Sequence, residues 1–145
     1  MQVNEKVKRI LDVLKDKKAI DVLELKVDEL TILADFMIIC SGTSVTHVKA
    51  LADELLLKVK NESGFEFLKV EGYNTARWIL IDFGDIVVHI FHREEREFYN
   101  LEKLWRDGII DAEDLSEIHK NFNTQKIYGE DTRMSELDNL NNLEN

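Results

Sequence analysis

The chain of 145 residues lacks several features that mark whole classes of protein. Its single cysteine, Cys40, cannot form an internal disulfide, which excludes a disulfide-stapled fold. No apolar run approaches the roughly 20 residues that a transmembrane helix requires. The first 19 residues are charged throughout and contain no signal-peptide apolar block. These absences favour a globular protein of the cytoplasm that does not enter a membrane.

Basic residues are also scarce. The sequence holds 19 Lys and Arg against 29 Asp and Glu, a net charge of −10. Residues 107–145 hold 10 of the acidic and 3 of the basic residues, so −7 of the charge lies there and −3 in residues 1–106. Because nucleic acids are bound mainly by neutralising phosphates, this charge disfavours direct sequence-specific nucleic-acid binding. It favours a basic protein partner.

The spacing of apolar residues predicts three helices and five strands. Helical spacing indicates helices over residues 4–17, 45–59 and 94–106, the last with Phe98, Leu101, Leu104 and Trp105 as its apolar positions. Strands are predicted over residues 19–27, 36–40, 65–71, 76–82 and 86–91. The last two are joined by the short turn Phe83-Gly84-Asp85, a hairpin signal. The order is α-β-β-α-β-β-β-α, which predicts an α/β (α+β) fold: a mixed β-sheet with helices packed on it.

Apolar periodicity weakens after Gly108. Residues 1–108 are therefore predicted to form one domain, and residues 109–145 an acidic C-terminal extension. Within the extension, Leu115, Ile118 and Phe122 indicate one short amphipathic helix. The residues from 129 onward are polar and acidic, and we expect them to be mobile.

The strand predicted over residues 76–82 carries the most informative pattern. Because alternate side chains share a face of a strand, Trp78, Leu80 and Asp82 point one way and Ile79 and Ile81 the other. One interpretation is that both faces are covered and Trp78 is part of the core. The other is that three helices on one face leave the Trp78 face partly bare, as a surface for protein docking. Both interpretations stay open at this point.

Residues 41–44, Ser-Gly-Thr-Ser, come between a strand and a helix. They could bind an anion at the helix N-terminus, but they lack the lysine and the spacing of a phosphate-binding loop. Capping of the helix by a hydroxyl group is the favoured interpretation.

A nucleotidyltransferase needs two close carboxylates on one strand face to hold Mg²⁺ beside a nucleotide. Asp82 and Asp85 are separated by a turn, and Asp53 and Glu54 are adjacent on a helix. We therefore predict no catalytic residues, no metal and no cofactor, and keep a nucleotidyltransferase-like enzyme as the alternative. Cys40, in an apolar run, is predicted to be structural.

Three blocks of sequence resemble the ribosomal silencing factor (Iojap) family. They are ADFMIICSGTS at residues 34–44, EGY at 71–73 followed by RWILIDFGDIVVHIF at 77–91, and REFYNLEKLW at 96–105. The blocks occur in order, at family-like spacing, over about residues 3–107. Phe83 stands where the family often has tyrosine.

The resemblance implies a translation repressor that binds the large-subunit ribosomal protein L-fourteen and blocks the joining of the ribosomal subunits. It also implies a nucleotidyltransferase-like sheet without catalytic activity, and often a homodimer when free. The partner-binding residues implied by position are Trp78, Leu80, Asp82, Tyr99 and Asn100.

Overall fold

The structure is a computed structural model, and it describes residues 2–26, 36–60, 62, 64–65, 69–100, 103 and 117–122. By internal contacts the chain divides into two units, Met1–Ala112 and Glu113–Asn145. In the second unit, residues 117–122 are helical and His119 and Phe122 are buried. Leu115, at the start of the predicted short helix, lies outside the described residues. All elements named below belong to the first unit.

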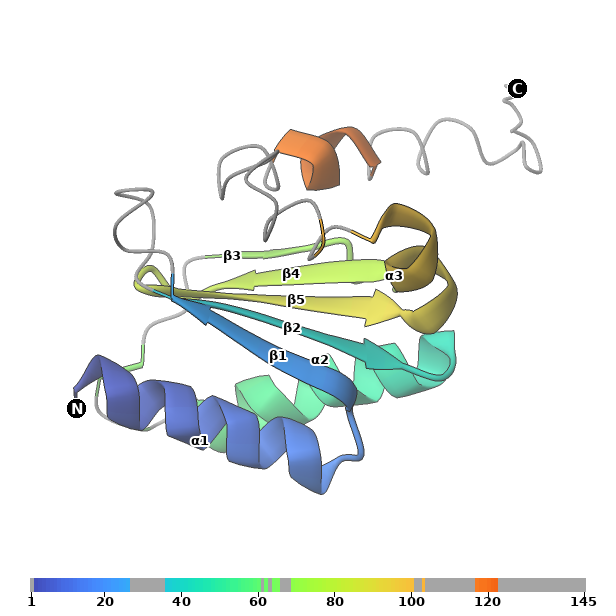
Figure 1. The fold of residues 1–145 in the computed structure, drawn as a ribbon. Helices are drawn as coiled ribbons and strands as arrows, with labels where there is room; N and C mark the ends of the chain where they lie inside the picture. The colour runs from blue at the N-terminus through green and yellow to red at the C-terminus, as the bar shows by residue number, and fades with distance from the viewer. Residues whose placement is uncertain are drawn as a thin grey trace. The chain divides into compact units, whose positions relative to one another are not determined.

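The first unit is built on a mixed five-stranded sheet (Figure 1). Its strands are β1 (Ile20–Lys26), β2 (Phe36–Gly42), β3 (Lys69–Glu71), β4 (Trp78–Asp82) and β5 (Ile86–His92). They lie in the order β1-β2-β5-β4-β3, with β2 and β5 parallel and the other neighbours antiparallel. With three helices, the order along the chain is α-β-β-α-β-β-β-α, which confirms the predicted mixed sheet and its order of elements.

Two helices, α1 (Val3–Asp16) and α2 (Val45–Val59), cover the same face of the sheet (Figure 1). Their apolar stripes meet the inward side chains of β2, β4 and β5 in one core. That core includes Ile10, Leu14, Ile38, Leu51, Leu55, Ile79, Ile81, Val88 and Ile90. The predicted buried strand is confirmed, since every residue of β2 is buried. No helix among the described residues is long and apolar enough to cross a membrane.

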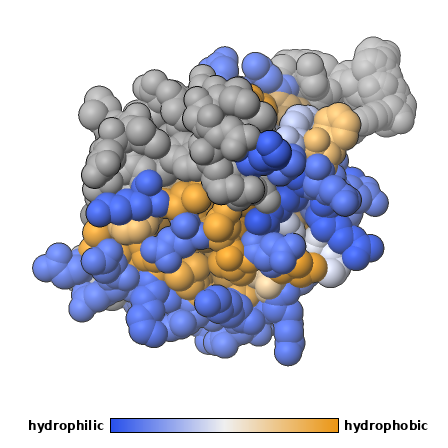
Figure 2. All heavy atoms as spheres, in the orientation of Figure 1, coloured by the Kyte–Doolittle hydropathy of each residue, from blue (hydrophilic) through white to orange (hydrophobic). Residues whose placement is uncertain are grey.

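The edge strand β1 pairs only with β2 and contains a register shift between Ile20 and Leu23. Its apolar residues Val22, Leu23 and Leu25 are only partly buried, as is usual at a sheet edge. Figure 2 shows hydrophobic residues in a band across this side of the molecule, bordered by hydrophilic residues.

The turn between β2 and α2 shows why residues 41–44 have their composition. The Ser44 hydroxyl oxygen accepts the His47 N–H at 3.1 Å, which confirms the predicted cap. The His47 ring also contacts this turn, where its Nδ1 accepts the Thr43 N–H at 3.0 Å. A Cβ on Gly42 would lie 3.0 Å from the Val48 backbone nitrogen. Glycine therefore permits the close approach of strand and helix.

The β4–β5 connection is the predicted hairpin. Phe83 N–H donates to the Ile86 carbonyl at 2.9 Å. The Asp82 carboxylate accepts the Gly84 N–H at 2.8 Å, and Gly84 has a φ of 93°, in the left-handed region that favours glycine. The register pairs Trp78 with Phe91 and Leu80 with His89.

The third predicted helix, over residues 94–106, is described in its first part. Helix α3 spans Arg93–Tyr99 and ends at Asn100, whose φ of 48° and ψ of 47° are left-handed. Phe98, one of the apolar positions of the predicted helix, is not part of the core, because its side chain is 80% exposed. Glu95 and Tyr99 contact Arg77 and Trp78 and are partly buried, whereas Phe98 is exposed. Leu101, Leu104 and Trp105 lie outside the described residues.

Candidate functional site

The sheet face opposite α1 and α2 carries a second buried set of side chains. Alternation along the strands places Trp78 and Leu80 of β4 on this face, together with His89 and Phe91, their partners on β5. Met37 and Ile39 of β2 join them by the same alternation. Trp78 and His89 are fully buried, and Leu80 is 4% exposed.

Trp78 lies at the centre of an aromatic cluster. Its ring stacks on Phe91, with centroids 4.5 Å apart and planes 29° apart, and it meets Tyr99 of α3 at 5.7 Å. The indole Nε1–H donates to His89 Nδ1 at 2.9 Å. Because that nitrogen accepts, the proton of a neutral His89 ring is on Nε2. The cluster therefore combines stacked rings with one buried hydrogen bond.

Of the two interpretations of the Trp78 face, the structure supports the covered one for Trp78 itself. Trp78 is 0% exposed, so the interpretation of Trp78 as a buried residue holds. One contribution to this cover comes from α3, which supplies no residue to the core under α1 and α2. Its Tyr99 turns instead to the Trp78 side and packs on the indole ring.

The other predicted partner-binding residues lie around this cluster. Tyr99 is partly buried against Trp78, and Asn100 follows it as the left-handed cap, donating its N–H to the Arg96 carbonyl. Asp82 is four residues from Trp78 along β4, roughly 13 Å at the rise of a strand, and is partly exposed. The structure therefore brings Trp78, Leu80 and Tyr99 together, and places Asp82 at the far end of β4.

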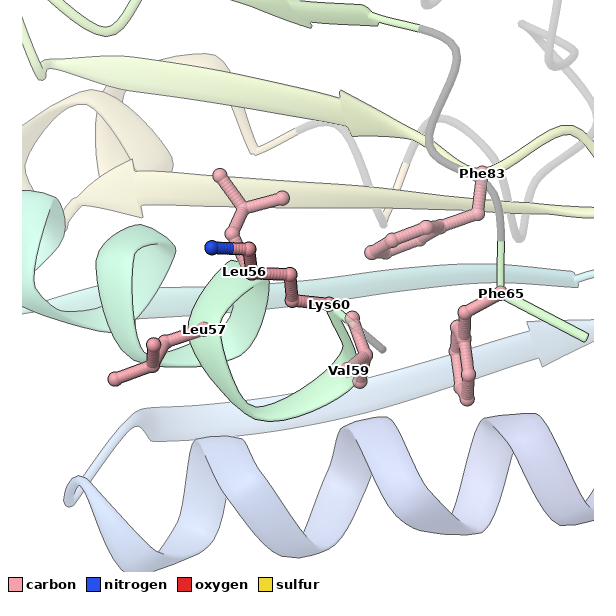
Figure 3. A pocket seen from close by; sticks show the side chains of 6 residues that line it. All are labelled: Leu56, Leu57, Val59, Lys60, Phe65 and Phe83. Carbon is pink, nitrogen blue, oxygen red and sulfur yellow. The ribbon is translucent and has the colours of Figure 1, made fainter. Parts of the chain in front are cut away.

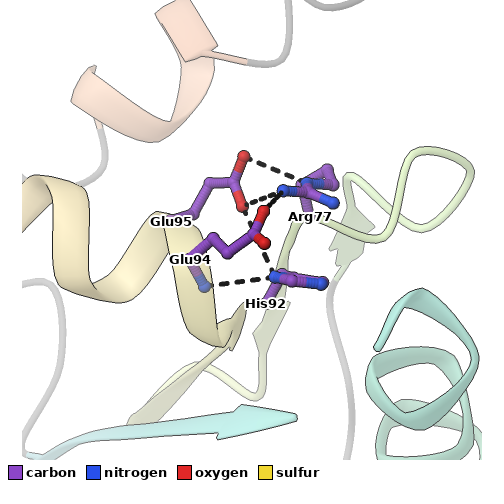
Figure 4. Close-up of polar contacts among 4 residues, drawn as sticks. All are labelled: Arg77, His92, Glu94 and Glu95. Carbon is purple, nitrogen blue, oxygen red and sulfur yellow. Dashed lines mark hydrogen bonds and ion pairs between the residues drawn. The ribbon is translucent and has the colours of Figure 1, made fainter. Parts of the chain in front are cut away.

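A charged cluster at the start of α3 was missed by the sequence analysis (Figure 4). The Arg77 guanidinium donates through Nε to Glu95 at 3.0 Å and through Nη2 to Glu94 at 2.7 Å. His92 Nδ1 accepts the Glu94 N–H at 3.1 Å and so caps the helix. These contacts attach α3 to the residue preceding β4. The hairpin register could have predicted this proximity, because it sets the start of β4 beside the end of β5.

His92, Glu94 and Glu95 place three potential metal-ligand atoms within 4.8 Å of one another. The Arg77 guanidinium already pairs with both carboxylates, and the His92 Nδ1 lone pair accepts the Glu94 N–H. Burial and the nearby Arg77 lower the pKa of His92, which favours its neutral form. The hydrogen bond and charge of Arg77 lower the pKa of Glu94. We interpret the cluster as an ion-paired helix start.

The carboxylates considered for nucleotidyl transfer do not converge. Asp82 accepts the Gly84 N–H, whereas Asp85 pairs with Lys6 of α1. On α2, Asp53 accepts the Tyr73 hydroxyl at 3.1 Å, and Glu54 lies within ion-pair distance of a lysine. Each therefore has a contact within the fold.

A small pocket lies at the other end of the molecule's core (Figure 3). It has a volume of about 250 Å³ and is lined by Leu56, Leu57, Val59, Lys60, Phe65 and Phe83. Phe65 and Phe83 meet edge to face, with centroids 5.6 Å apart. Such a volume is below the ~300–1,000 Å³ of typical small-molecule sites.

Comparison with known proteins identifies the family of this chain. The family model described as "Ribosomal silencing factor during starvation" matches residues 1–139. The chain belongs to this family. It is 53% identical over 93 residues to "Ribosomal silencing factor RsfS" of Halalkalibacterium halodurans, covering 64% of this chain and 79% of that protein. It is 47% identical over 95 residues to the protein of the same name from Bacillus subtilis, covering 66% and 80%.

The fold of this family member is also found in a solved structure. A crystal structure of a Chromobacterium violaceum protein matches with a TM-score of 0.68 and 38% identity, covering 72% of this chain and 87% of that one. The resemblance seen in the three sequence blocks is thereby confirmed at the level of the family and of the mixed sheet.

Proposed function

We propose that this ribosomal silencing factor binds the large ribosomal subunit through ribosomal protein L-fourteen, blocks association of the subunits and so represses translation in the cytoplasm. The observation that carries the proposal is the family match over residues 1–139. The proposed docking face is the side of the sheet with Trp78, Leu80, Asp82, Tyr99 and Asn100.

The charge of the chain supports a ribosomal protein as the partner. A net charge of −10 attracts a basic protein and is repelled by ribosomal RNA. Docking on RNA alone would have to overcome that repulsion, whereas docking on a basic protein uses the attraction. At the edge of the face, Asp82 is partly exposed and uses Oδ1 in the hairpin turn, which leaves Oδ2 for a Lys or Arg of the partner.

Steric blocking of subunit association requires no catalytic activity. A folded unit of about 110 residues has a radius of gyration of roughly 13 Å. Bound over one of the contact points between the subunits, it would hold the two surfaces apart by far more than the ~3 Å of a hydrogen bond. Because the proposed face is one side of the sheet, α1 and α2 on the other side would then point toward the incoming small subunit.

The burial of Trp78 changes how the face would be used. In the chain by itself the Trp78 ring is buried. The first contact with the partner therefore falls on the accessible margin of the docking face, which is formed by Asp82 and the end of α3. Trp78 would act either by holding Tyr99 in place or by becoming exposed during binding. The two roles predict different association rates. If exposure is required, association is slow and shows a limiting rate at high subunit concentration.

Co-sedimentation with purified large subunits tests the proposal, followed by a joining assay in which small subunits are added. We expect the chain to pellet with large subunits and to reduce the fraction of joined ribosomes in proportion to occupancy. Asp82→Asn should weaken the dependence of binding on salt, because it removes one charge from the margin. A chain that pellets with neither subunit would contradict the proposal.

The alternative is a nucleotidyltransferase-like enzyme. It has less support because Asp82 and Asp85 have separate contacts and no shared strand face. Calorimetry with Mg²⁺ and nucleoside triphosphates distinguishes the two, and micromolar binding abolished by Asp82→Asn would favour the enzyme. A homodimer of the free protein rests on the family resemblance alone, and analytical ultracentrifugation measures it.

A further inference from the structure

The outward side of α3 carries an exposed aromatic residue among acids. Phe98 is 80% exposed. Glu94, Glu97 and Phe98 are three and four residues apart and therefore lie on one side of the helix. Glu95 and Tyr99, which contact Arg77 and Trp78, are partly buried. The packing of the described chain makes little use of the Phe98 side chain.

Phe98 is the outer end of a series of aromatic contacts. Its ring meets Tyr99 edge to face at 5.1 Å, Tyr99 meets Trp78 at 5.7 Å, and Trp78 stacks on Phe91 at 4.5 Å. Of these four rings only Phe98 is exposed, since Tyr99 is partly buried and Trp78 and Phe91 are buried. The proposed docking face, closed at Trp78, is therefore continuous with an aromatic side chain that projects into solvent.

Single exposed apolar residues are common on protein surfaces. Leu57, 66% exposed on α2, is the other large one among the described residues. Phe98 differs from Leu57 in two ways. It touches a residue of the proposed docking face, and its neighbour Glu97 is exposed and forms no salt bridge with any residue that the structure describes. An aromatic ring beside an available carboxylate suits a partner with an apolar recess bordered by lysine or arginine.

The helix that presents Phe98 is held firmly to the sheet. Arg77 pairs with Glu94 and Glu95, and Arg96 donates to the Ile20 carbonyl at 3.4 Å and to the Ser41 hydroxyl at 3.1 Å. Because these contacts fix α3 before any partner arrives, little conformational entropy is lost when Phe98 is buried in an interface.

We propose that Phe98 is an anchor residue of the ribosome-binding surface, seated in an apolar recess of a basic large-subunit ribosomal protein, with Glu97 paired to a lysine or arginine at its border. This inference rests on the proposed function and extends its docking face from the closed Trp78 cluster to the outer side of α3. It adds Phe98 and Glu97 to the accessible margin that makes the first contact with the partner.

The test measures binding of the full chain to large ribosomal subunits purified from Bacillus subtilis, at two salt concentrations. Phe98→Ala should raise Kd by about tenfold or more, as for other aromatic anchors. Leu57→Ala removes the matched apolar residue on α2 and should change Kd less than about twofold. Glu97→Gln should slow association and weaken its salt dependence while leaving dissociation nearly unchanged. Circular dichroism and melting of the exposed-site variants should match wild type, and Phe98→Gln replaces the alanine variant if its melting shifts.

The outcomes separate this inference from the proposed function. If wild type binds and Phe98→Ala binds within about twofold of it, the Phe98 anchor is wrong and the proposed function stands. The inference also fails if Leu57→Ala raises Kd as much as Phe98→Ala does. The loss of affinity would then follow from removing any exposed apolar side chain. If wild type does not bind the subunits at all, the proposed function fails, and the anchor with it.

Discussion

Replacing Trp78 with alanine gives the most direct test of how the closed sheet face is built. The ring is 0% exposed, stacks on Phe91 at 4.5 Å and donates a hydrogen bond to His89 at 2.9 Å. Truncating a buried tryptophan costs about 3–5 kcal/mol in lost burial and cavity formation. Removing the donor to a buried nitrogen of His89 adds about 1–3 kcal/mol.

The sum, ~4–8 kcal/mol, is a large part of the ~5–15 kcal/mol that holds a typical domain folded. At about 4 °C per kcal/mol for a domain of this size, the midpoint of thermal unfolding should fall by roughly 15–30 °C. Trp78→Phe keeps a ring against Phe91 and Tyr99 but loses the indole N–H. Its cost should therefore be much smaller, about 1–3 kcal/mol.

Thermal unfolding, followed by circular dichroism, measures the midpoint of both variants. Binding to large subunits is then measured at a temperature where each variant is folded. A midpoint for Trp78→Ala within about 3 °C of wild type would refute the buried cluster as described. If Trp78→Phe is folded and binds as wild type does, the indole itself does not contact the partner, and the contacts lie at the margin.

Three further predictions concern other parts of the fold. Burial and Arg77 lower the pKa of His92, so its contribution to stability is complete above its unfolded pKa of about 6.5 and is lost as the pH falls through the folded value. His92→Asn keeps a capping side chain without titrating, and urea midpoints at pH 7.5 and 5.5 should differ less for it than for wild type. Gly42→Ala places a Cβ 3.0 Å from the Val48 backbone nitrogen and should cost about 1–3 kcal/mol in thermal unfolding, since α2 would have to move; an unchanged midpoint would contradict the close approach. Truncation after Gly108 should leave cooperative unfolding nearly unchanged, whereas a midpoint loss above roughly 10 °C would show that the extension belongs to the core.

The hairpin and the cap could be predicted because their causes are local. Gly84, two residues after Asp82, is typical of a tight turn. A serine before an apolar helical stripe is typical of a helix N-cap. The end of α3 could not be predicted in the same way. Phe98 has helical spacing with Leu101, and that spacing says nothing about which side of the helix faces the sheet. The orientation of α3 depends instead on Arg77, Arg96 and Tyr99, whose partners lie 17 or more residues away or on other strands.

The sequence by itself determined the order of helices and strands, the mixed sheet and the family, because periodicity, turn residues and three blocks of motif are properties of neighbouring positions. It also determined that Trp78 and Leu80 share a face, through strand alternation. Only the tertiary structure decided whether that face is bare. Burial depends on what packs against a side chain, and the short α3 brings Tyr99 over Trp78 while leaving Phe98 in solvent.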